Sequence, residues 1–173
     1  MTETLRLVDP TRRPGIFRRA YSAFAATRFA RFISRHVNWK LDLFLLRATR
    51  GRVAMTLMFP TAILETRGAR TGALRRNAII YWHDGDRVTI AASNAGSPGN
   101  PGWYHNVVAN PDVTFGGAPL RATIVPEDAH ARLWAQGDRV FPAYERYRRD
   151  AAAARRTIPL IQLVPNEHGS LRT

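Results

Sequence analysis

Cysteine is absent from this sequence of 173 residues. Its absence excludes a disulfide framework and any metal site built on thiolate ligands. Histidine is sparse as well, with five residues scattered so that none lies within one helical turn of another. Because zinc-binding histidines usually stand close together along the chain, the spacing predicts no metal site.

Long apolar runs are missing too. No stretch approaches the ~18 apolar residues that a membrane-spanning helix needs. Residues 1–13 (MTETLRLVDPTRR) lack the apolar core of a secretory signal, so we expect a cytoplasmic protein. There is also no glycine-flanked serine nucleophile, no P-loop and no defensible pair of catalytic carboxylates.

Positive charge, in contrast, is abundant. The formal net charge is +13, and every basic residue except Lys40 is an arginine. Such a charge favours an anionic partner, which can be a polyanionic cofactor, a membrane surface or nucleic acid. A genomic base composition that favours arginine codons, with the arginines on solvated surfaces, would give the same net charge. Position along the chain has to separate these explanations.

The N-terminal third reads as helical. Residues 16–37 carry aromatic and aliphatic side chains at helical spacing with arginines between them, and a second helical run ends at Gly51. This pattern fits a core-facing helix with a solvated basic side, or a basic amphipathic helix lying on an anionic bilayer. We therefore divide the chain into a helical segment of residues 1–50, a candidate for binding a membrane surface, and a main domain of residues 51–173.

The main domain alternates short strands with turns. A strong hairpin signal surrounds HDGD at residues 83–86, and a second strand–turn–strand unit surrounds GGAP at residues 116–119. Hairpin-linked strands with inserted helices indicate an α+β fold with a small barrel-like sheet. The strands are expected at residues 61–66, 73–83, 86–93, 112–115, 120–125 and 157–165, and the helices at 102–110, 126–137 and 142–155.

Residues 66–77 (TRGARTGALRRN) form the first candidate site. They hold two glycines, which permit backbone conformations that other residues resist, and four arginines. Turn amides and arginine forks bind phosphate and carboxylate groups, although an arginine-rich hairpin tip without a ligand has the same pattern. The strand that follows presents neither a uniformly polar nor a uniformly apolar face, so we expect both faces to be covered, one of them by a planar ligand or by protein.

Two further segments could complete a site. Residues 91–111 (AASNAGSPGNPGWYHNVVANP) run through a glycine-rich bend into a helix whose N-terminus favours negative charge. Trp103 in its first turn fits a core plug or a ligand wall, and the two roles are not exclusive. Tyr144 and Tyr147 share one helical face, where phenols donate hydrogen bonds to a substrate oxygen or simply pack. Together the segments predict a site for a flat, polar and anionic molecule.

The order of these motifs resembles a known family. The turn TRGARTG, the hairpin around HDGD, the loop AASNAG and the stretch NPGWYHNVVANP are followed by a tyrosine-bearing helix and the ending RRTIPLIQLVP. In this order, over roughly residues 40–165, they resemble the deazaflavin-dependent nitroreductase and quinone reductase family. The resemblance implies a split β-barrel and binding of coenzyme F420, an 8-hydroxy-5-deazaflavin with a phospholactyl oligoglutamate tail. It also implies an oxidoreductase that transfers a hydride from reduced F420 to a quinone-like or nitroaromatic acceptor.

The resemblance also assigns roles to individual residues. Contacts to the acceptor and its protonation fall to Tyr144, Tyr147 and Ser93. The resemblance implies that the coenzyme is bound by the arginine-rich turn, the strand after it, and the loop and first helical turn of the second segment. These residues are Ala69, Arg70, Thr71, Arg75, Arg76, Asn77, Ala78, Ile79, Ile80, Ala91, Ala92, Ser93, Asn94, Gly102, Trp103, Tyr104, His105 and Asn106.

The sequence departs from the family pattern at three of these positions. Ala69 stands at the first basic position of the turn, and Asn94 stands where the relatives carry a loop lysine. Both changes remove a positive charge, so contacts to the tail are expected to shift to Arg76 or Arg67. His105 replaces an aliphatic residue and adds a polar contact or is exposed.

Three other functions compete with this interpretation. An FMN-dependent split-barrel oxidoreductase and a non-catalytic deazaflavin-binding protein at the membrane share the same motifs. A nucleic-acid module is disfavoured, because aromatics and arginines do not alternate along one strand face. A membrane-dissolved quinone would explain the basic N-terminal segment, which would place the protein peripherally on the inner face of the cell membrane.

Overall fold

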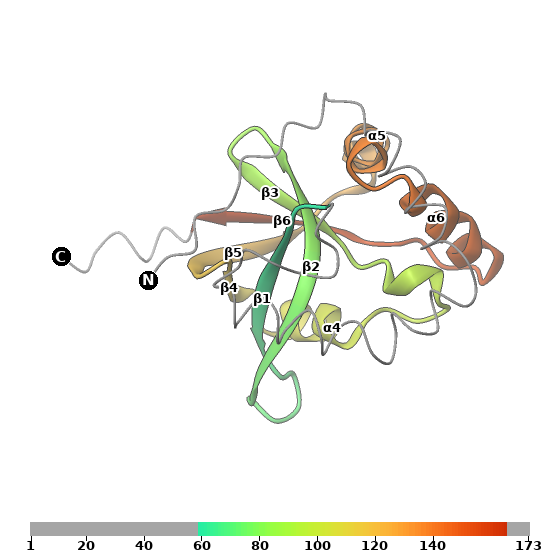
Figure 1. Cartoon of the computed structure of the whole chain (residues 1–173). Coiled ribbons are helices and arrows are strands. Elements are labelled where there is room, and N and C mark those ends of the chain that lie inside the picture. Colours follow the sequence, from blue (N-terminus) through green and yellow to red (C-terminus); the bar gives the residue numbers. More distant parts are fainter. Residues whose placement is uncertain (1–58, 166–173) are drawn as a thin grey trace.

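A closed antiparallel β-barrel organises the chain (Figure 1). The computed structural model describes residues 59–165. The six strands follow one another around the barrel in the order β1-β2-β3-β6-β5-β4, which confirms the predicted α+β barrel. The strands are β1 (Thr61–Arg67), β2 (Leu74–Asp84), β3 (Arg87–Ala91), β4 (Asp112–Phe115), β5 (Ala118–Ile124) and β6 (Leu160–Pro165).

The segment of residues 1–50, with its two predicted helices, lies outside the described residues. Within residues 59–165, no helix is both long enough and apolar enough to cross a membrane.

Glycines form the tight turns between paired strands. Gly85 has a φ of +63° in the β2–β3 turn, and Gly116 and Gly117 have φ values of +56° and +84° between β4 and β5. Two successive residues with positive φ match the twist of a two-residue hairpin, and glycine adopts this conformation without a steric cost. Both predicted hairpins are therefore confirmed.

Strand β2 contributes to two hydrophobic cores. Its alternate side chains point to opposite faces, as strand geometry requires. Tyr81 faces the barrel interior, where its ring meets Phe115 at a centroid distance of 5.4 Å. Trp82 faces outward and is fully buried beneath two helices. Protein side chains therefore cover both faces of β2 at this end of the strand, as predicted.

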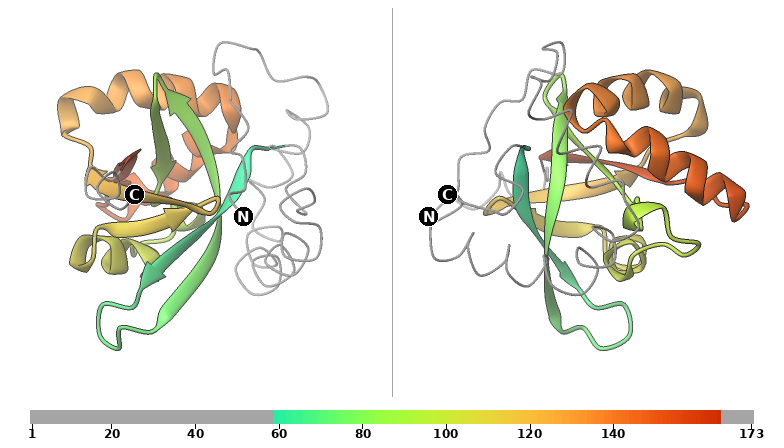
Figure 2. Two further views of the ribbon diagram at one scale, coloured as in Figure 1. Left: turned by 90° about the vertical axis from the view of Figure 1, so that its left-hand side faces the viewer. Right: turned by 45° about the vertical axis from the view of Figure 1, so that its right-hand side comes forward.

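Two helices cover the outer face of the barrel next to Trp82 (Figure 2). These are α5 (His130–Val140), which follows the short helix η3 (Glu127–Ala129), and α6 (Ala143–Ala153). A Cβ at Gly137 would lie 3.0 Å from the Trp82 ring. The predicted end of α5 near Gly137 is therefore wrong, because this glycine makes room for the indole inside the helix and does not terminate it.

A third helix packs at the other side of the barrel. Helix α4 (Gly102–Ala109) follows the short helix η2 (Asn94–Gly96) and contributes Trp103 and Val107 to the interior core. The predicted helix end near Asn110 is confirmed, since Asn110 is its C-terminal cap. Pro111 follows, and the residue before a proline avoids the helical conformation.

A carboxylate network joins β2 to α5 and β6. The Asp84 carboxylate accepts a hydrogen bond of 3.0 Å from Arg132 Nη2, another of 3.2 Å from Gln136 and a third of 3.0 Å from Gln162. Arg132 Nη1 also donates to it. The Arg132 hydrogen bond lowers the pKa of Asp84, and burial opposes that effect only in part.

This network makes part of the stability depend on pH. A carboxyl group whose pKa is lower in the folded state stabilises the fold above its unfolded pKa of about 3.9, and the contribution is lost as the pH falls through the folded-state value. We expect Asp84→Asn to lower the free energy of unfolding at pH 7 by about 1–3 kcal/mol.

Urea unfolding at several pH values tests this prediction. The difference between wild type and Asp84→Asn should shrink below about pH 4. The control is Asp112→Asn, because the Asp112 side chain is 63% exposed and its ion pair with Arg121 contributes little. A difference for Asp84→Asn that stays constant down to pH 3 would contradict the assignment.

Candidate functional site

The turn between β1 and β2 extends beyond the barrel (Figure 1). Two backbone hydrogen bonds close it, from the Gly68 amide to the Ala73 carbonyl at 2.9 Å and from the Gly72 amide to the Gly68 carbonyl at 2.8 Å. Gly72 has a φ of +65°, which explains the glycine at this position. The predicted turn is confirmed, and it presents its arginines to solvent.

The four arginines of this turn are not equivalent. Arg76 forms an ion pair with Glu65 on the neighbouring strand, so its charge is already compensated. Arg67, Arg70 and Arg75 are exposed, and none of them forms an ion pair with any residue in the described part of the chain. The turn therefore carries three uncompensated positive charges. Of the two substitutes expected for the missing charge at Ala69, Arg67 is available and Arg76 is engaged.

Asn106 on α4 fixes this turn to the barrel. Its Oδ1 accepts a hydrogen bond of 3.0 Å from the Ala69 amide, and its Nδ2 donates one of 3.1 Å to the Thr66 hydroxyl. Thr66 is buried. Each of these two hydrogen bonds makes a net contribution of about 0.5–1.5 kcal/mol to the stability of the turn. Both polar groups of the Asn106 side chain thus form hydrogen bonds within the protein.

The loop between β3 and α4 has an unusual backbone. Asn94, Ala95 and Gly96 adopt successive positive φ values of 46°, 51° and 76°. Asn94 also donates through Nδ2 to the Gly99 carbonyl at 2.8 Å. Non-glycine residues in this conformation are strained, and such strain concentrates at functional sites. The Asn94 side chain closes the loop with this hydrogen bond, whereas a lysine at this position would supply a positive charge.

This loop rests directly on α6. A Cβ at Gly96 would lie 2.9 Å from Asp150 Cβ and 3.1 Å from Tyr147 Cα. Only glycine permits so close an approach of two backbones. The contact places Ser93 and Asn94 on the same side of the molecule as the tyrosine-bearing helix.

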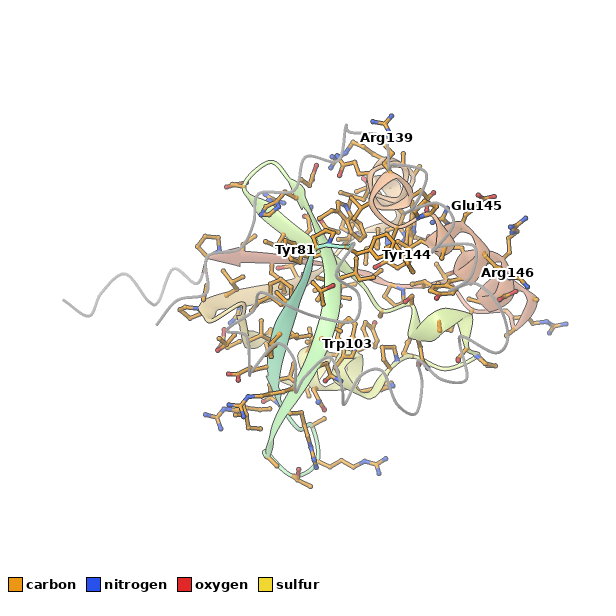
Figure 3. The ribbon with its side chains drawn as sticks, viewed as in Figure 1. Tyr81, Trp103, Arg139, Tyr144, Glu145 and Arg146 are labelled. Atoms are coloured by element: carbon orange, nitrogen blue, oxygen red, sulfur yellow. The ribbon has the colours of Figure 1, made fainter. Side chains whose placement is uncertain are left out.

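The two predicted tyrosines belong to a buried aromatic cluster. Tyr144, which is labelled in Figure 3, lies 6.4 Å from Tyr147 and 5.9 Å from Trp82 between ring centroids. Burial raises the pKa of the Tyr144 phenol, so the hydroxyl keeps its proton and is able to donate a hydrogen bond. Both tyrosines therefore pack in the core, which is one of the two roles that their spacing predicted.

The remaining predicted residues occupy three environments. Trp103, Ala91 and Ala92 are buried, and Trp103 is part of the interior core. Half-buried residues on β2 and α4 form the transition to the surface. These are Asn77, Ala78, Ile79, Ile80 and Tyr104, while Ala69, Arg70, Thr71, Gly102 and His105 are exposed.

Arg156 is a site residue that the sequence motifs do not reveal. This half-buried residue follows the C-terminal end of α6 and donates hydrogen bonds to the loop after β3. The signal in the sequence was weak, because an arginine in RRTIP resembles any of the other arginines of the chain. Only the folded arrangement brings it to the loop.

These features fit a flat anionic cofactor of the kind that the motifs imply. Uncompensated arginines at the turn suit a polyanionic tail, and the half-buried face of β2 beside the strained loop suits a ring. No group of three or more potential metal ligands occurs among residues 59–165.

Comparison with known proteins gives one consistent result. The sequence pattern of the F420H(2)-dependent quinone reductase family matches residues 40–165. Proteins named F420H(2)-dependent quinone reductase from Mycobacterium tuberculosis strains H37Rv and CDC 1551 are each 39% identical over 116 residues, which cover 61% of this chain and 78% of each relative.

Two solved structures share the fold of this chain. A structure described as an F420-H2 dependent reductase (FDR-A) is 26% identical, with a TM-score of 0.53, and the match covers 60% of this chain and 93% of that chain. A second structure, described as a domain-swapped dimer, has the same identity and TM-score and is matched over 79% of its length.

Proposed function

This chain belongs to the F420H(2)-dependent quinone reductase family, and we propose that it reduces a quinone with coenzyme F420 as its cofactor. The structural observation that supports this most strongly is the β1–β2 turn. There, three arginines that form no ion pair with any residue between positions 59 and 165 stand beside a half-buried strand face. A neutral or cationic ligand would gain nothing from such a turn, whereas an oligoglutamate tail would.

The residues of the turn would hold the coenzyme tail. Arg70 and Arg75, together with Arg67, supply guanidinium forks for carboxylate groups. The residues of β2 from Asn77 to Ile80 and the strained loop at Ser93 would flank the ring. Asn106 keeps the turn attached to α4, so the tail and ring positions stay in register.

The chemistry divides between cofactor and protein. When bound, reduced F420 supplies a hydride from ring carbon 5. Reduction of a quinone to a hydroquinone also needs a proton, and the growing charge on the quinone oxygen needs hydrogen bonds. Tyr144, Tyr147 and Ser93 would provide these donors. The protonated state of the Tyr144 phenol suits it to this role.

A two-step measurement tests the function. Oxidised F420 is titrated by fluorescence, with FMN titrated in parallel, and reduced F420 is then mixed with menadione. We expect tight binding of F420, weak binding of FMN and rapid oxidation of the reduced coenzyme. Tight binding of FMN alone would identify a flavin enzyme, and binding of F420 without turnover would identify a carrier.

Two finer points belong to the same proposal. Nitroaromatic compounds would act as adventitious acceptors at the site, because a nitro group also accepts a hydride and a proton. The basic pattern of residues 16–37, which lie outside the described residues, supports attachment to an anionic membrane that contains the quinone.

The membrane attachment has a direct test. Deleting residues 1–37 should abolish co-sedimentation with liposomes that contain anionic lipid, while the full chain should sediment with them less as the salt concentration rises. Equal sedimentation of both proteins would refute the attachment.

Loss of a turn arginine should affect binding according to tail length. Arg75→Ala should raise the Kd for F420 with a long glutamate tail about tenfold, which corresponds to one charge-assisted contact of about 1.4 kcal/mol. A coenzyme without glutamates should lose much less. Arg139→Ala, an exposed arginine on α5 far from the turn, is the matched control (Figure 3). Equal losses for both tail lengths would remove Arg75 from the tail site.

Loss of the Tyr144 hydroxyl should affect turnover more than binding. Tyr144→Phe should lower kcat with menadione by about tenfold or more, because a hydrogen bond to the acceptor is lost, and should change the Kd for F420 by less than about twofold. Tyr81→Phe, which removes a phenol hydroxyl in the barrel interior, controls for the effect of losing a buried hydroxyl. A normal kcat for Tyr144→Phe would make this tyrosine a packing residue only.

A further inference from the structure

Arg156 occupies a fixed position just after α6. The Arg156 amide donates to the Ala151 carbonyl at 3.0 Å, and the Arg155 amide donates to Ala152 at 2.9 Å. Arg155 has a φ of +54°. This pair of bonds with one left-handed residue is the Schellman ending of a helix. It directs the chain, and the Arg156 side chain with it, back toward the loop that follows β3.

The guanidinium of Arg156 binds that loop at four points. Nε donates to Asn100 Oδ1 at 2.9 Å, and Nη1 donates to the carbonyls of Ser93 at 3.2 Å and Ser97 at 2.6 Å. Nη2 donates to the Ala92 carbonyl. Three backbone carbonyls from both ends of the loop therefore converge on one side chain. A planar fork with five N–H donors can satisfy such a set, and a lysine ammonium cannot in the same geometry.

The inward carbonyls determine where the loop amides point. The structure has no cis peptide among the described residues. In a trans peptide the N–H of one residue points opposite to the carbonyl of the residue before it. Because the carbonyls of Ala92 and Ser93 face Arg156, the amides of Ser93 and Asn94 face away from it. Neither amide donates a hydrogen bond to any residue between positions 59 and 165.

The charge of Arg156 has no acidic partner among residues 59–165. No ion pair joins it to a carboxylate in the described part of the chain, and burial lowers its pKa. An arginine guanidinium still stays protonated in proteins. A hydrogen bond from a cation to a carbonyl also polarises the peptide group and strengthens its N–H as a donor. The loop thus presents two free amides backed by a positive charge.

We propose that Arg156 is a positioning residue of the coenzyme site, which shapes the loop of residues 92–100 so that the Ser93 and Asn94 amides face the bound coenzyme as donors. The inference rests on the proposed function for the identity of the ligand, but the shape of the loop does not depend on it. Arg156 contacts the loop and would act on the coenzyme through it.

The test compares Arg156→Gln and Arg156→Lys with Arg155→Gln. Arg155 is adjacent and exposed, so its substitution by glutamine removes the same charge without touching the loop. Hydrogen exchange of the free proteins reports the loop, fluorescence titration reports the Kd for oxidised F420, and thermal unfolding reports overall stability.

For Arg156→Gln we expect at least tenfold faster exchange of the Gly96 and Ser97 amides, which are bonded to Ser93 and Asn94 carbonyls. We also expect at least a tenfold higher Kd, about 1.4 kcal/mol, with unchanged exchange in the barrel strands. Arg156→Lys should recover only part of both losses, and Arg155→Gln should match the wild type.

The outcomes separate this inference from the proposed function. If the wild type does not bind F420 but the loop exchange changes as described, the function fails and the loop role stands. If Arg156→Gln or Arg156→Lys binds F420 like the wild type, the positioning role is wrong. Faster exchange throughout the barrel, with a lower Tm, would make Arg156 a general stability residue and also overturn the role.

Discussion

The two faces of strand β2 are the constraint on which the rest of this structure depends. Tyr81 is buried inside the barrel, and the next residue, Trp82, is buried beneath α5 and α6. Burying side chains of this size stabilises the fold by about 1.5–3 kcal/mol each. Since one rigid strand serves both cores, the barrel and the helices cannot shift independently. The same strand starts at the arginine-rich turn, so the turn inherits a fixed position.

The site is held by contacts that come from its non-ligand side. Asn106 bonds to the turn from α4, Gly96 lets the strained loop touch α6, and Arg156 gathers the carbonyls of that loop. The hydrogen bonds of Asn106 and Arg156 occupy polar groups of the protein that would otherwise be available to a ligand. Among the described residues, the groups left without a protein partner include the turn arginines Arg67, Arg70 and Arg75 and the amides of Ser93 and Asn94, which are all donors. Under the proposed function, this division would give a strongly basic chain an ordered anion site.

The strands, the hairpins and the ligand class were predictable because they follow from local patterns. Alternating side chains fix the faces of β2, and paired glycines fix the turn at Gly116. The supporting contacts were not predictable. The Asn106 bond to Ala69 spans 37 positions and the Arg156 bond to Ala92 spans 64, and no local spacing encodes either. Gly137 misled for the same reason, since its partner Trp82 belongs to a distant strand.

The location of the coenzyme is the central claim, and amide hydrogen exchange with and without oxidised F420 tests it most directly. The structure predicts slower exchange on binding in residues 67–76 of the turn and β2 and in residues 92–106 of the loop and α4. The barrel side that carries the β4–β5 turn should show no change. Protection confined to the β4–β5 turn or to α5, with none at the arginine-rich turn, would contradict the account.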